Sequence, residues 1–471
     1  MYYNVKSERR VLIMKSDKKI SASFIYFFGA FGGILFGYDI GVMTGALPFL
    51  ELNWHLSSAA FTIGWITSSV MFGAIFGGAL AGFLSDKLGR RKVILIAAII
   101  FMIGSILSSL APNDGQYYLI IVRIGLGLAV GAASALVPSY MSEMAPAHMR
   151  GRLSGINQLM ICCGMLISYI MDYVLKGLTP DLAWRAMLGC AAIPALILFL
   201  GVLALPESPR FLIKTGQIEK AKQVLSFIRK PDEIDGELNQ INQTAKQESS
   251  AIRNTSWGTL FTGKYRYLVI AGLGVAAFQQ FQGANAIFYY IPLIVQKVTG
   301  HAATNALMWP IIQGIILVAG AIFFMIIADK FNRRTLIRFG GIVMALSFIL
   351  PSVINVLIPN ANPMMIVVFL CIYVAFYSFT WAPLTWVLVG EIFPLVIRGR
   401  AAGLASSFNW IGSFLVGLLF PVMTASMSDS DVFAIFGIVC ILGVIFVTFF
   451  VPETKGRTLE EIEEESFKKA S

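Results

Sequence analysis

Long apolar runs, separated by short polar connections, make up most of the chain. Each run is long enough to cross the roughly 30 Å hydrocarbon core of a bilayer as an α-helix. Twelve such runs can be marked, at residues 24–49, 61–84, 93–110, 117–141, 153–175, 186–205, 267–295, 306–328, 335–358, 364–389, 401–425 and 432–451. The pattern therefore predicts an all-α integral membrane protein with twelve transmembrane helices.

The largest polar segment, residues 206–266, divides these runs into two sets of six. Within it, residues 217–229 carry apolar positions at helical spacing, which predicts a short amphipathic helix on the membrane surface or on the ends of the bundle. We therefore expect four parts, which are a first six-helix bundle at 1–205, a linker at 206–266, a second six-helix bundle at 267–451 and a tail at 452–471.

The two halves repeat three charged motifs in the same order. The motif at residues 86–91 recurs at 329–334, the one at 143–152 recurs at 391–400, and the Pro-Glu pair at 206–207 recurs at 452–453. The offsets are 243, 248 and 246 residues, which is nearly one value. This agreement indicates two homologous, pseudo-symmetric six-helix bundles, and in transporters built from such repeats the substrate site lies between the repeats near the middle of the bilayer.

Each repeated motif falls at a helix end that we expect to face the cytoplasm. Carboxylates and guanidinium groups there can pair across helix ends, locking the inner side when the halves meet and releasing it when they part. A simpler interpretation is that these charges only end the helices and fix the topology. We expect a cytoplasmic charge gate, whose members are Asp86, Arg90, Arg91, Glu143, Arg150, Glu207, Asp329, Arg333, Arg334, Glu391, Arg398 and Glu453.

Composition agrees with the pattern, and the positions of the basic residues decide what the net charge means. The 471 residues are 57% hydrophobic and 13% charged, with a mean hydropathy of +0.75 and a net charge of +10. Of 36 Lys and Arg, all but four lie in the termini or the even-numbered connections, the exceptions being Arg123, Lys176, Arg185 and Lys297. The positive-inside rule then puts both termini in the cytoplasm. The basic excess predicts contact with anionic lipid and no nucleic-acid partner.

One carboxylate, Asp39, lies well inside the first apolar run. An Asp at the centre of a membrane helix costs about 2.5 to 3.5 kcal/mol on insertion scales, so it normally faces a partner or a watery cavity. Glycines at positions 29, 33, 37, 41 and 45 form a ridge at four-residue spacing, and Asp39 falls about opposite to it. We expect the ridge to pack on a neighbouring helix while Asp39 faces a cavity.

Arg123, inside the fourth run, lies at a similar depth and is the expected partner of Asp39. An ion pair that forms in one conformation and opens in the other would alternately release and bind a proton, which is the chemistry of a symporter. A static pair used only for packing is the alternative, and Asp172 in the fifth run is a rival partner for Arg123.

Four motifs carry a resemblance that covers essentially the whole chain. They are Gly-x-x-x-Asp-Lys-x-Gly-Arg-Arg at 82–91, Pro-Glu-Ser-Pro-Arg at 206–210, Gln-Gln-Phe-x-Gly-x-Asn-x-x-Phe-Tyr-Tyr at 279–290 and Pro-Glu-Thr-Lys-Gly-Arg at 452–457. The chain resembles the major facilitator superfamily, specifically its sugar porter family. The first motif is found across the superfamily, and the other three together are close to diagnostic of sugar porters.

The resemblance implies a transporter of the major facilitator fold that binds one monosaccharide centrally and alternates its access. The implied sugar-binding residues are Phe36, Gln158, Gln279, Gln280, Asn285, Trp386, Asn409 and Trp410, and the implied outer gate is Tyr289 and Tyr290. Amide side chains suit vicinal hydroxyls because they offer paired donors and acceptors, and an indole can pack on the apolar face of a pyranose. For any isolated amide, bonding between helices is the simpler interpretation.

Four positions depart from the pattern of the family. Leu317 stands where many members have a sugar-contacting Asn, and Ala382 stands where many have Gly, so the identity of the sugar is open between hexose and pentose. Asn332 and Met325 replace the usual glycines of the second charge motif, which affects gating more than specificity.

Proton-coupled symport of a monosaccharide is the function that we expect. In the family, the position matching Asp39 is Asp in members that look proton-coupled and often Asn in passive facilitators. A passive uniporter and a non-transporting sugar sensor are the alternatives. The sequence has no pattern for a metal cluster, an activated nucleophile or a phosphate-binding loop, so we expect no enzymatic activity, no metal and no cofactor. We expect a monomer in the plasma membrane or a bacterial cytoplasmic membrane.

Overall fold

The computed structural model describes residues 21–145, 150–253, 257–300, 302, 304–328, 330–358, 362, 364–394, 396–457 and 461–462. Across these residues, every regular element is an α-helix or a short 3-10 helix. The first set of helices comprises α2 (Ala22–Ala30), α3 (Gly32–Asn53), α4 (Ala60–Leu88), α5 (Arg90–Ser109), α6 (Gln116–Met144), α7 (Arg150–Leu175), α8 (Pro180–Cys190) and α9 (Ala192–Ala204), with the 3-10 helix η1 (Leu56–Ser58) between α3 and α4.

The linker and the second set of helices follow. The linker contains α10 (Pro209–Lys214), α11 (Ile218–Ile228), α12 (Ile234–Arg253) and η3 (Trp257–Phe261). The second set comprises α13 (Gly263–Phe281), α14 (Ala284–Thr299), η4 (Asn305–Leu307), α15 (Met308–Ile327), α16 (Arg333–Leu357), α17 (Met364–Phe379), α18 (Trp381–Ile392), α19 (Arg398–Ser426) and α20 (Asp429–Phe450). The amphipathic helix predicted at 217–229 is α11, and it packs on α10 and α12.

Eleven of the twelve predicted runs correspond to helical segments that are long and apolar enough to cross a membrane. The seventh run, at 267–295, is instead divided between α13 and α14. The chain breaks there because Gly283 has a φ of +89°, a left-handed conformation that residues with a Cβ rarely adopt. Helix ends are thereby brought into the middle of a membrane span, where transporters commonly bind their substrates.

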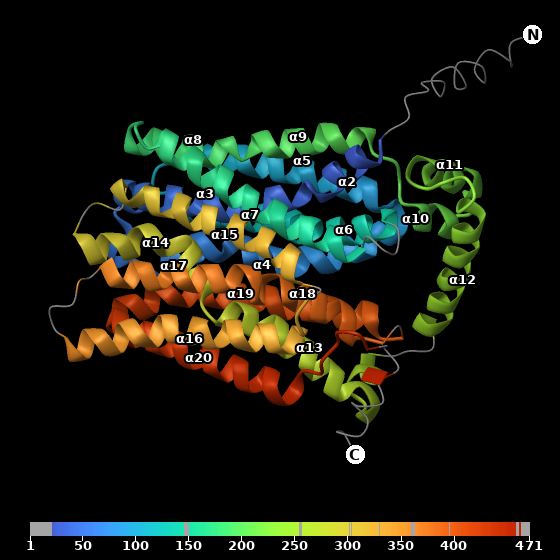
Figure 1. The fold of residues 1–471 in the computed structure, drawn as a ribbon. Coiled ribbons are helices and arrows are strands. Elements are labelled where there is room, and N and C mark those ends of the chain that lie inside the picture. Colours follow the sequence, from blue (N-terminus) through green and yellow to red (C-terminus); the bar gives the residue numbers. More distant parts are fainter. Residues whose placement is uncertain are drawn as a thin grey trace, which may run out of the picture.

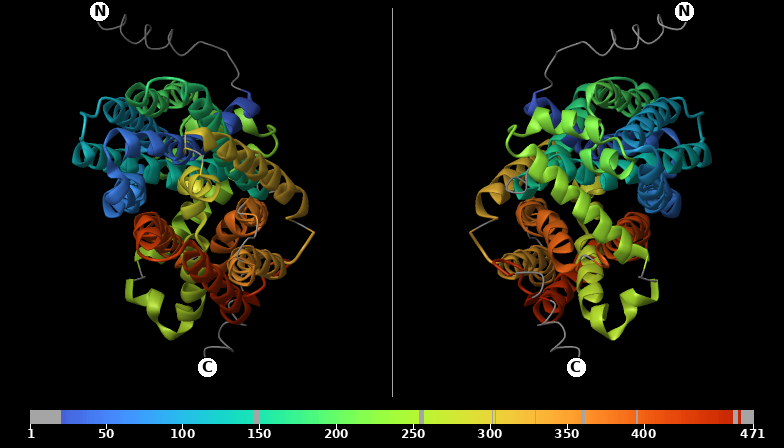
Figure 2. Two further views of the ribbon diagram at one scale, coloured as in Figure 1. Left: turned by 90° about the vertical axis from the view of Figure 1, so that its left-hand side faces the viewer. Right: turned by 90° about the vertical axis from the view of Figure 1, so that its right-hand side faces the viewer.

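The two sets of helices lie side by side and meet along a long interface. In Figure 1, α2 to α9 occupy the upper part of the molecule and most of α13 to α20 the lower part, and the two views of Figure 2 agree. Contacts across the interface join α3 to α14, α4 to α19 and α7 to α15. Side-chain contacts that cross this interface include those of Phe36 with Trp410 and of Thr67 with Tyr290.

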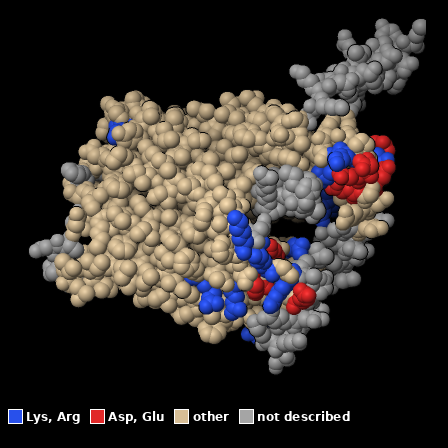
Figure 3. Space-filling model, in the orientation of Figure 1, with Lys and Arg blue, Asp and Glu red and all other residues tan. Residues whose placement is uncertain are grey.

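The linker helices α10 to α12 cover one end of the bundle, which we name the linker end. In Figure 1, α12 runs along this end from the first set of helices towards the second. On the face drawn in Figure 3, the charged side chains gather at the linker end, while the rest of the surface is almost free of them. This distribution is what a bilayer requires of a surface in contact with its hydrocarbon core. We name the other end of the bundle the opposite end.

Glycine packing between helices is closer than any other residue would allow. The ridge predicted on the first run lies on α7, where an ideal Cβ at Gly37 would come within 1.9 Å of the carbonyl oxygen of Ile161. On α6, an ideal Cβ at Gly127 would lie 2.1 Å from the carbonyl oxygen of Val70 on α4. The predicted packing role of the ridge is confirmed.

Replacing Gly127 with Ala is expected to destabilise the protein by about 1–3 kcal/mol, because α4 and α6 must move apart to admit the methyl group. Gly125→Ala, two residues away on the same helix, is the matched control because nothing lies within 4 Å of its ideal Cβ. Thermal unfolding of the purified proteins in detergent measures the stability of both variants. Equal melting temperatures for the two variants would contradict the close packing.

Candidate functional site

The charges predicted to meet inside the membrane do meet. Arg123 on α6 donates from one Nη to a carboxylate oxygen of Asp39 on α3, at 3.4 Å. Arg123 is 1% exposed and Asp39 2% exposed, so water does not screen the pair. The Nε of Arg123 has no hydrogen-bond partner among the described residues, so the guanidinium group has unused donor capacity. Asp39 is closed off in this conformation and does not face open solvent.

The rival partner, Asp172, is not bonded to Arg123. Its side chain lies against α3, where an ideal Cβ at Gly45 would come within 2.3 Å of it. Neither of its carboxylate oxygens has a hydrogen-bond partner within the described part of the chain, and the residue is 1% exposed. The choice between Asp39 and Asp172 that the sequence left open is therefore decided in favour of Asp39.

Amide side chains predicted to bind sugar form one connected cluster within the second set of helices. Asn409 on α19 donates to the carbonyl oxygen of the Gln279 side chain at 2.6 Å and accepts from Gln280 at 3.3 Å. Asn285 at the start of α14 donates to Gln280 at 3.1 Å and also to the hydroxyl of Ser413. We name these five residues the amide cluster.

The break between α13 and α14 explains the shape of the amide cluster. Gln280 lies at the end of α13 and Asn285 at the start of α14, so the turn at Gly283 brings their amides together. Gln280 is half-buried, whereas Gln279 and Asn285 are almost fully buried. The cluster offers donors and acceptors that can be exchanged for those of a bound hydroxyl compound.

Aromatic residues join the amide cluster to the first set of helices. Phe36 on α3 contacts Trp410 on α19 edge to face, with ring centroids 5.2 Å apart. Gln158 on α7 is half-buried, and its amide contacts Cys162 at 3.7 Å. Trp386 on α18 is 41% exposed and makes no described hydrogen bond to the amide cluster.

Two of the four positions that depart from the family pattern, Leu317 and Ala382, are buried. Leu317 on α15 is 2% exposed and contributes only apolar surface. Ala382 lies in the first turn of α18, and its carbonyl oxygen accepts from Gln279 at 2.8 Å. The break in the tenth run lies just before it, at Thr380, and so the amide cluster is anchored to a second helix break.

At the opposite end, hydrogen bonds join the two sets of helices. The hydroxyls of Thr67 on α4 and Tyr290 on α14 lie 2.5 Å apart, and Tyr290 also donates to the carbonyl oxygen of Gly417 at 2.8 Å. Thr44 on α3 donates to the carbonyl oxygen of Phe288 at 2.7 Å. The predicted gate residue Tyr289 is 0% exposed. The bundle is therefore closed at this end by contacts that include two residues, Thr44 and Thr67, which no sequence motif indicated.

Thr67→Val is expected to shift the conformational equilibrium towards opening at the opposite end. One hydrogen bond contributes about 0.5–1.5 kcal/mol, so the ratio of open to closed molecules should rise about 2- to 12-fold. Ser69→Ala on the same helix is the control, because its hydroxyl donates to the carbonyl oxygen of Ile66, within α4. Spin labels at positions 52 and 427, in a background without other cysteines, measure the distance distribution. Equal distributions for the two variants would contradict a closing role of Thr67.

The charge cluster of the first half ties three helix ends together at the linker end. One carboxylate oxygen of Glu207 accepts from the backbone N–H groups of Arg90 and Arg91, at 3.0 and 3.2 Å, where α5 begins. A carboxylate at this position is stabilised by the unpaired N–H groups of the helix terminus. The side chain of Arg90 forms ion pairs with Glu143 at 3.2 Å and with Asp86 at 3.4 Å.

The second half repeats this arrangement. Glu453 accepts from the backbone N–H groups of Arg333 and Arg334, both at 3.0 Å, where α16 begins. Arg333 lies 3.8 Å from Glu391, which corresponds to the pair between Arg90 and Glu143. The sequence repeat is thus also a repeat of contacts.

Each half also has a hydroxyl group that takes part in its charge cluster and that was not predicted from the sequence. Ser208 donates to Glu143, and Thr454 donates to Glu391 at 2.5 Å. The two residues follow the repeated Pro-Glu pairs at the same offset of 246 residues, so comparing the halves could have found them.

The ion pairs among the described members of the clusters each join residues of one half. Arg398 donates to the carbonyl oxygen of Phe393, in the same half, at 3.0 Å. The side chain of Arg150 and the whole of Asp329 lie outside the described residues. Pairing across helix ends is confirmed, whereas its use as a gate between the halves stays a prediction.

A membrane bundle of two repeated halves, closed at one end and holding a buried polar cluster, is the architecture of a solute transporter. The family model described as "Sugar (and other) transporter" matches residues 25–465. The chain belongs to this family.

Relatives and solved structures agree with this assignment over nearly the full length. The chain is 42% identical to a D-xylose transporter of Levilactobacillus brevis, covering 95% of this chain and 96% of the relative. It is 37% identical to a galactose-proton symporter of Escherichia coli, covering 95% of each. The structure of the proton:xylose symporter XylE bound to 6-bromo-6-deoxy-D-glucose matches with a TM-score of 0.79 and 30% identity, covering 94% of this chain and 98% of XylE.

Proposed function

We propose that this protein takes up a monosaccharide together with a proton by alternating access. The observation that carries the proposal is the buried ion pair of Asp39 and Arg123 in the first set of helices, beside an amide cluster in the second set. The D-xylose transporter and the galactose-proton symporter among its relatives support both the class of substrate and the coupling. The protein acts as a transporter and not as an enzyme, and it needs no cofactor or metal.

Sugar binds centrally between the two six-helix halves. Amide groups of both halves bond its hydroxyls, and the aromatic rings pack on its apolar face. The residues in this role are Phe36, Gln158, Gln279, Gln280, Asn285, Trp386, Asn409 and Trp410. The substrate is a hexose or a pentose, and the buried, apolar Leu317 offers no hydrogen bond to its hydroxyls.

Asp39 carries the proton. A protonated Asp39 releases Arg123, and a deprotonated Asp39 attracts it, so the ion pair forms when the proton leaves. The pair is formed in a conformation closed at the opposite end. Because the opposite end is closed while the pair is formed, the proton that has left Asp39 is released towards the linker end.

The linker end faces the cytoplasm, with both termini on that side, because the basic residues gather there. The opposite end is then the outer end, and Tyr289 and Tyr290 form the outer gate. The charge clusters form the cytoplasmic gate between an N-terminal bundle at 1–205 and a C-terminal bundle at 267–451, joined by the linker at 206–266 and followed by the tail at 452–471. The protein works as a monomer in the cell membrane, in contact with lipid.

Transport into proteoliposomes tests the proposal. An inward proton gradient should drive labelled monosaccharide above its outside concentration, and an uncoupler should abolish that accumulation. Sugar added without a gradient should make the medium more alkaline. Uptake that only equilibrates, with no alkalinisation, would indicate a passive uniporter, and sugar binding without transport would indicate a sensor. Competition by a panel of hexoses and pentoses identifies the substrate.

A further inference from the structure

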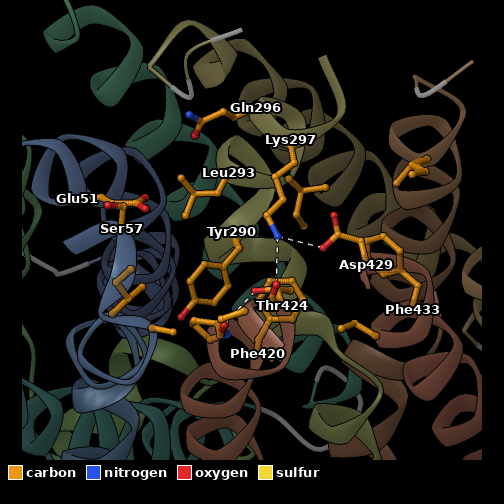
Figure 4. Close-up of a pocket in the computed structure, with 17 residues that line it drawn as sticks. Glu51, Ser57, Tyr290, Leu293, Gln296, Lys297, Phe420, Thr424, Asp429 and Phe433 are labelled. Atoms are coloured by element: carbon orange, nitrogen blue, oxygen red, sulfur yellow. Dashed lines mark hydrogen bonds and ion pairs between the residues drawn. The ribbon is translucent and has the colours of Figure 1, made fainter. Parts of the chain in front are cut away.

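A cavity of about 220 Å³ lies at the outer end of the protein, between the two sets of helices. It is many times larger than the roughly 10–15 Å³ that one water molecule needs by the same measure, so it can admit an organic solute. Figure 4 shows Glu51 and Ser57 on one side of this cavity, with Asp429 and Phe433 on the other. We name it the outer cavity.

Tyr290 connects the outer cavity to the gate. Its ring lines the cavity, while its hydroxyl bonds to Thr67 and to the carbonyl oxygen of Gly417. The other lining positions of α14 lie one to two turns further towards the outer end of that helix. A solute in the outer cavity therefore sits directly outside the closed gate, on the route to the amide cluster.

The lining combines aromatic rings with a charged pair. The rings of Tyr290 and Phe420 pack with their centroids 5.0 Å apart. Lys297 lies 3.1 Å from a carboxylate oxygen of Asp429, and it also donates to the carbonyl oxygen of Thr424 at 3.4 Å, as Figure 4 shows. Lys297 is 49% exposed and Asp429 40% exposed, so a solute can reach both groups.

This chemistry suits an uncharged sugar. Aromatic rings can pack on the apolar face of a pyranose, as they do in many small-molecule sites. An ammonium group donates to hydroxyl oxygens, and a carboxylate accepts from hydroxyl hydrogens, in charge-assisted hydrogen bonds. The cavity holds two carboxyl groups, Glu51 and Asp429, against one ammonium group, so an anionic sugar gains no net attraction there.

We propose that the outer cavity is a second monosaccharide subsite, occupied before the gate at Tyr290 opens. It takes uncharged sugars and holds them through Lys297 and Asp429. The proposal rests on sugar transport as the function, and it adds a binding step that the amide cluster does not provide. The simpler alternative is that Lys297 and Asp429 only tie α14 to α20.

Protection of a cysteine tests the subsite directly. Ser57→Cys places a thiol at the cavity, and a water-soluble maleimide measures its labelling rate, with the chain lacking this substitution as the background. The transported sugar at saturating concentration should slow labelling at least about 3-fold, because most of the protein then has a bound sugar that shields the thiol from the reagent. Gluconate, an anion of similar size, should not slow it.

Second-site variants separate the subsite from the central site. In a Ser57→Cys, Gln280→Ala protein, protection should persist, because Gln280 belongs to the amide cluster and does not line the outer cavity. Lys297→Gln or Asp429→Asn should abolish protection. Either variant alone tests the role of the charged pair if the other fails to fold. Asp431→Asn, on the same helix but outside the cavity, should retain it.

Two results would overturn the subsite. Protection that disappears with Gln280→Ala would come from the central site, and protection that survives both Lys297→Gln and Asp429→Asn would not depend on the charged pair. Failure of the proposed function is distinguishable, because it appears as a lack of sugar uptake by the Ser57→Cys protein itself.

Discussion

Asp39→Asn is expected to abolish proton-driven accumulation of sugar while sugar exchange continues. Asparagine cannot release a proton, so the coupling step is lost. Its side-chain oxygen can still accept a hydrogen bond from Arg123, which keeps that buried guanidinium from being left without a partner. Accumulation in proteoliposomes should fall to the equilibrium ratio of one, and exchange should no longer respond to an imposed pH gradient.

The matched control for Asp39→Asn is Asp172→Asn. Asp172 is as deeply buried as Asp39, yet its carboxylate has no described hydrogen-bond partner and does not contact Arg123. We expect this variant to keep proton-driven accumulation. If Asp39→Asn still concentrates sugar in a manner sensitive to an uncoupler, or if Asp172→Asn is the variant that loses accumulation, the assignment of the proton site is wrong.

Periodicity and depth predicted the features that depend on one helix at a time. The twelve runs, the glycine ridge and the similar depth of Asp39 and Arg123 could all be read from residue spacing, because the rise and the turn of an α-helix are fixed. The repeat added a relation between halves, and the contacts of Glu207 and Glu453 with the starts of α5 and α16 follow it closely.

Contacts between distant helices could not be predicted in this way. Thr67 and Tyr290 are 223 residues apart, and neither spacing nor charge distinguishes Thr67 from other small polar residues in the spans. The break at Gly283 could not be predicted for a similar reason. The chain contains 43 glycines, and nothing in the sequence marks Gly283 as one of those whose φ is positive in the structure. Trp386 was expected beside a sugar, but whether its exposed ring meets one depends on how far the halves are apart.

The amide cluster also bears on the simpler interpretation of buried amides, which is that they only bond helices together. Asn409 bonds to α13 through both Gln279 and the backbone carbonyl oxygen of Ala276, at 2.6 and 2.9 Å, so it does hold helices together. Among the described residues, however, its side-chain carbonyl oxygen accepts only from Gln280, at 3.3 Å, which is long for a hydrogen bond. Gln280 is the half-buried member of the cluster, so this contact is the one that a sugar hydroxyl can replace at least cost.

Asn409→Ala is therefore expected to weaken sugar binding by a factor on the order of 10 to 100, since losing a hydrogen-bond partner in a buried site costs about 1–3 kcal/mol. Equilibrium binding of labelled sugar to purified, monodisperse protein measures the loss. Ser407→Ala on the same helix is the control, because its hydroxyl donates to the carbonyl oxygen of Gly403, within α19, and its loss should not affect affinity.

Coupling separates the role of Asn409 in binding from its role in packing. Because Asp39 and Arg123 are untouched in Asn409→Ala, each sugar that is still carried should move with a proton, and accumulation at saturating sugar should remain sensitive to an uncoupler. A variant that unfolds, or that binds sugar normally but transports none, would instead show that Asn409 acts only between helices. A weakened affinity with intact coupling requires that the amide cluster and the ion pair be separate sites linked through the motion of the halves.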